Sequence, residues 1–106
     1  MDEIIAMLRQ FNSERDWGQY HTPENLAKSV SIEAGELLEC FQWSPEYDLS
    51  SVREELADVM LYCLMLADKT GIDPLLAMKE KIAKNAANYP VEKVKGSSKK
   101  YTELEE

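Results

Sequence analysis

The sequence predicts an all-α fold, a four-helix bundle, for this chain of 106 residues. Three observations support this prediction. Apolar residues recur at helical spacing in four segments, two of those segments open with a capping residue followed by proline, and no segment shows the alternation typical of a strand. The length fits one domain, which we place at residues 1–90 and which a polar tail of residues 91–106 follows.

The first two helices are predicted at residues 2–14 and at residues from Thr22 to about 42. Residues 2–14 space their apolar side chains three and four apart, as a helix requires. In the second segment, Thr22 suits the N-cap position and Pro23 suits the first helical position. Gly35 weakens this helix by about 1 kcal/mol relative to alanine, and it lets a ligand or another backbone approach closely.

The third helix is predicted to start at Ser50 or Ser51 and to end before Gly71, a typical residue just beyond a helix end. Its second half, residues 59–67, is apolar on every side, which indicates burial in a bundle or at a subunit interface. Asp73 and Pro74 then open a fourth helix, which should run to about residue 88. The polar tail alone would be expected to be flexible, and the alternative is that it contacts the neighbouring subunit or the substrate.

Composition excludes several classes of function. A net charge of −8 disfavours binding to a nucleic acid polymer, and a single histidine, His21, makes a zinc site improbable. Cys40 and Cys63 are interpreted as buried, reduced thiols of a cytoplasmic protein. The N-terminus is too charged for a signal peptide, and no apolar run reaches the length of a membrane span.

Two acidic pairs form the strongest chemical signal in the sequence. Glu33 with Glu36, and Glu55 with Asp58, are each spaced i, i+3 and border the apolar stripe of their helix. If the two stripes pack antiparallel, the four carboxylates face each other and repel unless a divalent cation neutralises them. Oxygen ligands alone favour Mg²⁺, with Mn²⁺ as the alternative. The competing interpretation is a solvated surface, since 20 acidic residues produce such pairs by chance.

Other polar and aromatic residues could complete a nucleotide site. Lys81, Asn85 and Tyr89 share one face of the fourth helix, where they could bond phosphate or sugar or form an ordinary solvated face. Trp17 and Trp43 lie at helix-to-loop transitions, where they could stack on a base or plug the ends of the bundle.

Several segments together resemble the MazG-like all-α NTP pyrophosphatases, and most of all their dCTP pyrophosphatase branch. These segments are residues 33–43 (EAGELLECFQW), 54–59 (EELADV) and 85–90 (NAANYP), with further likeness at 15–17 (RDW) and 100–102 (KYT). The family signature is EExxE followed by ExxD. Ile32 stands at the first acidic position, which the dCTP branch also leaves without an acid. Leu8 stands where vertebrate members carry histidine, so the base preference remains open.

The resemblance implies roles for specific residues. The residues that catalyse the reaction and bind Mg²⁺ would be Glu33, Glu36, Glu55 and Asp58. The base would be held by Trp17 and Trp43. Sugar and phosphates would be bound by Tyr62, Lys81, Asn85 and Tyr89. The implied reaction is hydrolysis of a (d)NTP, either dCTP or a modified pyrimidine dNTP, to the monophosphate and pyrophosphate, as cleansing of the nucleotide pool. Family members are homo-oligomers, dimers or tetramers, with sites built across subunits. The alternative is a non-catalytic helical dimer that binds nucleotide or a protein partner.

Overall fold

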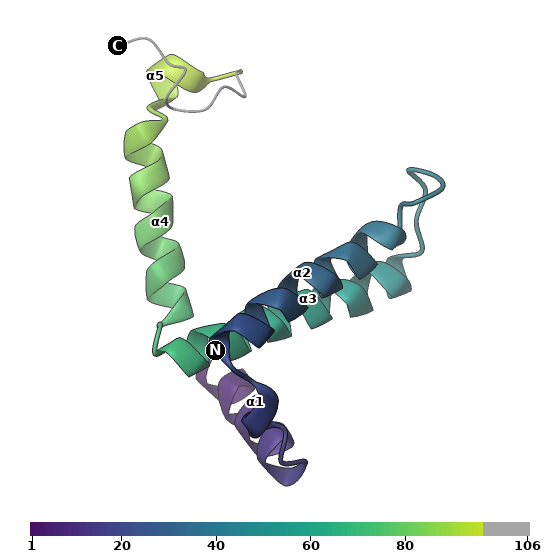
Figure 1. Ribbon diagram of the computed structural model, residues 1–106. Helices are drawn as coiled ribbons and strands as arrows, with labels where there is room; N and C mark the ends of the chain where they lie inside the picture. The colour runs from purple at the N-terminus through teal and green to yellow at the C-terminus, as the bar shows by residue number, and fades with distance from the viewer. Residues whose placement is uncertain (97–106) are drawn as a thin grey trace. The chain divides into compact units, whose positions relative to one another are not determined.

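The computed structural model describes residues 1–96, and in that range it contains helices and no strand (Figure 1). The all-α prediction is therefore confirmed. The elements in chain order are α1 (Asp2–Glu14), the 3₁₀ helix η1 (Gly18–Tyr20), α2 (Pro23–Glu39), α3 (Leu49–Thr70), α4 (Pro74–Asn88) and α5 (Val91–Val94).

Helix caps explain most of these boundaries. The Asn25 N–H donates to Thr22 Oγ1 over 3.2 Å at the start of α2, and the Leu76 N–H donates to Asp73 Oδ1 over 3.1 Å at the start of α4. Both predicted starts are confirmed. Gly71 ends α3 in the left-handed region, with φ of 73°, as expected of a glycine there.

Two helix boundaries differ from the sequence prediction, and one short helix was not expected. Helix α3 starts at Leu49 because the Asp48 carboxylate accepts hydrogen bonds from the backbone and hydroxyl of Ser51, so the expected start at Ser50 or Ser51 was wrong. Helix α2 ends at Glu39 because the next three N–H groups bond to carbonyls three residues back, in tighter turns. The short helix α5 lies within the tail that was expected to be flexible.

The chain divides into two compact units, Met1–Ile72 and Asp73–Glu106. In the first unit, α2 lies antiparallel along α3, and α1 packs against α3 (Figure 1). Leu26 of α2 is only 1% exposed and is buried together with Leu64 and Ala67 of α3. Arg9 of α1 and Asp68 of α3 form a two-pronged ion pair that ties these helices together.

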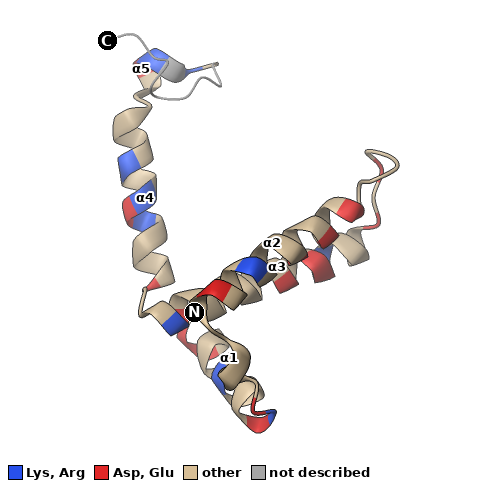
Figure 2. Ribbon diagram, in the orientation of Figure 1, with Lys and Arg blue, Asp and Glu red and all other residues tan. Residues whose placement is uncertain are grey.

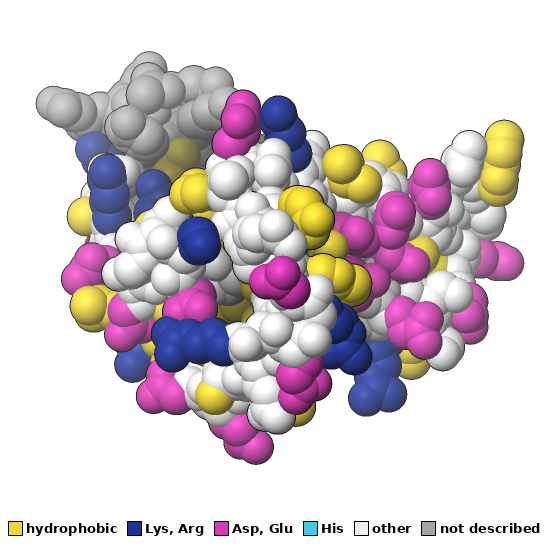
Figure 3. All heavy atoms as spheres, turned by 60° about the horizontal axis from the view of Figure 1, so that its bottom comes forward, with side chains coloured by type: hydrophobic (Ala, Val, Ile, Leu, Met, Phe, Trp, Pro, Cys, Tyr) yellow, Lys and Arg dark blue, Asp and Glu magenta, His cyan; other side chains and the backbone are white. Residues whose placement is uncertain are grey.

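The first unit leaves much apolar surface uncovered. Ile32 and Leu38 of α2, and Leu56 and Met60 of α3, are all exposed. Figure 3 shows hydrophobic side chains among the acidic ones on the face that it presents. The apolar stretch of α3 is thus only partly buried within its own unit, with Leu64 and Ala67 as its buried residues. Cys63 lies exposed in this stretch, so its expected burial was wrong.

The second unit consists of α4 and α5 in the described range. Lys81 and Asn85 are exposed on α4, and the backbone N–H of Tyr89 donates to the Asn85 carbonyl over 2.8 Å at the helix end. Residues 100–102 of the family resemblance lie outside the described residues. Among residues 1–96, no helix is long and apolar enough to cross a membrane.

Candidate functional site

Acidic side chains from α2 and α3 converge on the seam between the two helices. Glu33 of α2 and Glu55 and Asp58 of α3 each place one carboxylate oxygen within 4.8 Å of the others. The i, i+3 spacing keeps each acidic pair on one face, and the antiparallel packing turns those faces together. Figure 2 shows acidic residues along both helices at this seam.

Two oxygens of this cluster are buried without a partner. Glu33 Oε2 and Glu55 Oε2 have no hydrogen bond, and within residues 1–96 neither carboxylate forms an ion pair with lysine or arginine. Buried anionic oxygens without a partner are costly, because they lose water and gain nothing in exchange. The donor set consists entirely of carboxylate oxygens, so it fits a hard divalent cation such as Mg²⁺.

The surroundings of Glu33 and Glu55 raise the pKa values of these two acids. The pKa of Glu33 rises to about 6, first through a hydrogen bond with the Glu36 carboxyl, then through burial and the charges of Glu36, Asp58 and Glu55. The pKa of Glu55 is raised by burial, followed by the charges of Glu36 and Asp58. Glu36 therefore interacts with the cluster, although it is exposed and is not one of the three closely spaced acids.

A cavity of about 240 Å³ adjoins the acidic cluster. Asp58 and Tyr62 of α3 line it on one side, and Trp17 lines it from the segment after α1. Trp17 packs edge-on against Phe11, with ring centroids 5.6 Å apart. The structure thus brings Trp17 and Tyr62 together beside Asp58, which joins an aromatic cavity to the acidic seam.

Trp43 lies away from this cavity. It is 89% exposed, in the loop between α2 and α3. Trp17 precedes α2 and Trp43 follows it, and 17 helical residues separate the ends of α2 by about 25 Å. Trp17 and Trp43 of one chain are therefore too far apart to stack on the same nucleobase. Lys81, Asn85 and Tyr89 belong to the second unit, and their roles stay predictions.

Sequence reasoning missed Asn12 as a residue of this cavity. Asn12 follows Leu8 by four residues and lies on the same side of α1, where the pattern calls for an apolar residue. A polar amide at such a position is the signal that could have found it. His21 lines the same cavity.

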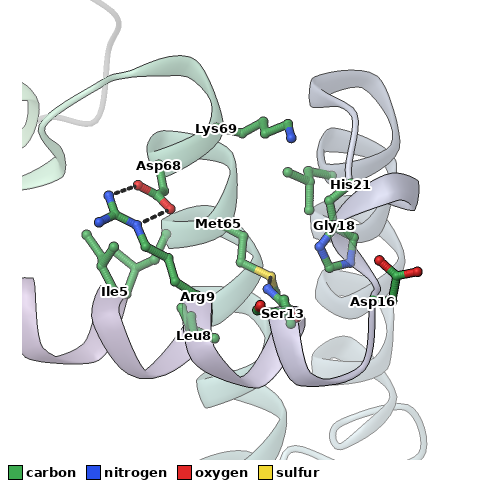
Figure 4. Close-up of a pocket in the computed structure, with 13 residues that line it drawn as sticks. Ile5, Leu8, Arg9, Ser13, Asp16, Gly18, His21, Met65, Asp68 and Lys69 are labelled. Carbon is green, nitrogen blue, oxygen red and sulfur yellow. Dashed lines mark hydrogen bonds and ion pairs between the residues drawn. The ribbon is translucent and has the colours of Figure 1, made fainter.

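A second cavity of about 380 Å³ lies between α1, the start of α2 and the end of α3 (Figure 4). Arg9 and Asp68 face each other at one side, and the Met65 side chain points between α1 and His21. Both cavities are lined in part by the same four residues, Leu8, Asn12, His21 and Met65. The two cavities therefore adjoin.

Comparisons with known proteins agree with this geometry. Residues 28–104 match the MazG-like family. The chain is 36% identical to human dCTP pyrophosphatase 1 over 114 aligned positions, which cover 98% of this chain and 67% of the human protein. Bovine dCTP pyrophosphatase 1 is 35% identical over 98% of this chain and 68% of its own length.

The same similarity holds in three dimensions. The crystal structure of a pyrophosphatase from Archaeoglobus fulgidus superposes with a TM-score of 0.79 at 45% sequence identity. The match covers 85% of this chain and 92% of the archaeal one. With the family match, the identity to the curated relatives and the shared fold, the chain belongs to the MazG-like family of all-α nucleoside triphosphate pyrophosphatases.

Proposed function

We propose that this protein is a Mg²⁺-dependent enzyme that hydrolyses a pyrimidine deoxynucleoside triphosphate, dCTP or a modified form of it, to the monophosphate and pyrophosphate. The observation that carries the proposal is the pair of buried, unpartnered oxygens of Glu33 and Glu55 beside the aromatic cavity. The names of the curated relatives support the choice of dCTP. Removal of unwanted nucleotides from the pool is the corresponding role.

Glu33, Glu55 and Asp58 would hold the metal, with Glu36 beside them. A bound Mg²⁺ would neutralise the triphosphate and polarise its phosphorus–oxygen bonds. The water oxygen forms a bond to phosphorus while the bridging oxygen between the α- and β-phosphates leaves with one of the two products. Glu36 is exposed at the edge of the cluster, where its carboxylate can accept the proton of that water.

The cavity beside Asp58 supports the placement of the base. Its volume of about 240 Å³ lies below the roughly 300–1,000 Å³ of pockets that enclose whole ligands, so it fits one part of a nucleotide. Trp17 and Tyr62 provide aromatic surface for a base, with the sugar and phosphates directed towards the acidic seam. Lys81 and Asn85 of α4, and Tyr89 directly after this helix, are proposed to bind sugar and phosphates.

We further propose that the enzyme is a homo-oligomer, a dimer or a tetramer. Exposed apolar side chains on α2 and α3, Ile32 at 63% among them, support burial against another copy. The separation of Trp17 from Trp43 supports it too, because a base between two tryptophans needs the second one from a neighbouring subunit. Unpaired Cys40 and Cys63 fit a reducing, cytoplasmic location.

The test is a screen for pyrophosphate release across normal and modified NTPs and dNTPs, with Mg²⁺ and with chelator. We expect monophosphate and pyrophosphate in equal amounts, most rapidly from a cytosine-containing dNTP, and no turnover with chelator. Glu33→Gln and Asp58→Asn should abolish turnover while circular dichroism stays helical. Hydrolysis at the wild-type rate by both variants would contradict the proposal.

The alternative is a non-catalytic helical dimer that binds nucleotide or a protein partner. It predicts that calorimetry detects nucleotide binding while no pyrophosphate is released under any metal condition. The presence of all four acids of the seam favours the enzyme over this alternative.

A further inference from the structure

Asn12 occupies a distinctive place in the cavity beside the acidic seam. Its side chain is half-buried on α1, and it lines the same cavity as Trp17, Asp58 and Tyr62. Its backbone carbonyl accepts a hydrogen bond from the Trp17 N–H over 3.0 Å. Asn12 and Trp17 are therefore held in a fixed relation to each other, so that an aromatic face and an amide group border one space.

The amide of Asn12 has unused hydrogen-bonding capacity. Asn12 Nδ2 donates to the Met65 sulfur over 3.3 Å, and a thioether is a weak acceptor. Within residues 1–96, the structure gives the side chain no other hydrogen bond. The neighbouring wall of the cavity is apolar, with Leu8, Phe11 and Leu61. The oxygen and the second N–H of the Asn12 amide are therefore available to a ligand in the cavity that presents a complementary edge.

The chemistry of an asparagine amide defines that edge. Its oxygen accepts and its nitrogen donates, so it pairs in two-pronged fashion with an amino group beside an unprotonated ring nitrogen. Cytosine presents this pair on its Watson–Crick edge. At the two ring positions where cytosine presents this pair, uracil and thymine present a carbonyl and a ring N–H, and the amide must reverse to pair with them there. Reversal turns the amide oxygen towards the Met65 sulfur and removes the hydrogen bond between them.

We propose that Asn12 reads the base of the substrate, and that Met65 orients its amide to favour an amino-bearing base such as cytosine over uracil and thymine. This inference rests on the proposed function for the identity of the ligand. It adds a specificity-determining residue on α1 that neither the family signature nor the acidic seam indicates.

The test measures binding as well as turnover. Isothermal titration with the product nucleotides dCMP and dUMP measures base selection without catalysis. Base selection during turnover is measured as kcat/KM for dCTP, dUTP and 2-deoxyribose 5-triphosphate, which lacks a base. We expect Asn12→Leu, similar in size, to lower the preference for dCMP over dUMP by about 5- to 150-fold, the worth of one two-pronged base contact. Hydrolysis of the base-free triphosphate should not change.

Ser13→Ala is the matched control, because Ser13 is the next residue of α1 and lines the second cavity but not the one beside the seam. Met65→Leu removes the sulfur at similar volume and should also lower the preference, with affinity for dUMP maintained or increased. If Asn12→Leu does not fold, Met65→Leu tests the inference in its place.

Three results would overturn the inference: an unchanged preference in both variants, an equal loss with the base-free triphosphate, or a wild-type protein that prefers dUMP. A wild-type protein that binds dCMP selectively through Asn12 but releases no pyrophosphate would refute the proposed enzyme and retain this inference.

Discussion

Replacing Glu33 with glutamine should stabilise the metal-free protein, although it should abolish metal binding. The pKa of Glu33 is raised from 4.5 to about 6, first by the hydrogen bond with Glu36 and then by burial and neighbouring charges. An acid whose pKa is higher in the folded state stabilises the fold while it is protonated. For Glu33 this stabilisation is complete below its ordinary pKa of 4.5 and is lost as the pH rises through its folded-state pKa of about 6. At pH 8 the ionised Glu33 therefore destabilises the metal-free fold.

The size of this effect follows from the pKa. At 1.36 kcal/mol per unit, the difference between 4.5 and about 6 corresponds to about 2 kcal/mol. A change of 1 kcal/mol shifts the Tm of a domain of this size by about 4–8 °C. Relaxation of the neighbouring charges and entry of water reduce this energy. We therefore expect Glu33→Gln to raise the Tm by about 5–10 °C at pH 8 in chelator. At pH 4.5 the two proteins should melt together.

Magnesium should reverse the order of stability. Free Mg²⁺ at 100 times its Kd would stabilise the wild-type protein by about 2.7 kcal/mol, while the variant would gain much less. Thermal unfolding with and without Mg²⁺, at pH 4.5 and 8 and at one protein concentration, measures all these conditions. The reasoning is refuted if the variant is no more stable than the wild type at pH 8 in chelator, or if Mg²⁺ stabilises both equally.

Further predictions test the cap, the core, the assembly and the metal. Thr22→Ala removes the cap of α2 and should cost about 1 kcal/mol in denaturant unfolding, whereas Thr22→Ser should cost little. Leu26→Ala should cost about 2–5 kcal/mol in the same assay, with exposed Lys28→Ala as the near-neutral control. Ile32→Asp should dissociate the oligomer in sedimentation and reduce turnover; a persisting oligomer would place the interface elsewhere. Mg²⁺ affinity from calorimetry should fall about tenfold per pH unit below about 6, because Glu33 protonates there.

Local signals made most of the fold predictable. Thr22 with Pro23, and Asp73 with Pro74, fix helix starts through side-chain oxygens and a preset φ, and both effects act within one turn. The start of α3 was misplaced because aspartate and serine are both good caps, and only the backbone decides that Asp48 reaches the Ser51 N–H. The end of α2 was misplaced because residues 40–42 continue in tighter turns that have the same apolar spacing.

The acidic part of the site was predictable for a different reason. Helical spacing places Glu33 and Glu36 on one ridge and Glu55 and Asp58 on another, so only the packing of α2 on α3 had to be assumed. The polar amide of Asn12 on the apolar side of α1 was visible in the sequence, but its contact with Met65 was not predictable, because it depends on how α1 crosses α3. Spacing within one helix carries no information about such a contact between helices.

We propose that the seam between α2 and α3 binds the catalytic metal. The most direct measurement is an anomalous difference map from crystals grown with Mn²⁺ and a non-hydrolysable triphosphate analogue. The account predicts a manganese peak bonded to carboxylate oxygens of Glu33, Glu55 and Asp58, with the phosphates of the analogue on its open side. A peak bound elsewhere, with these carboxylates turned into solvent, would contradict it.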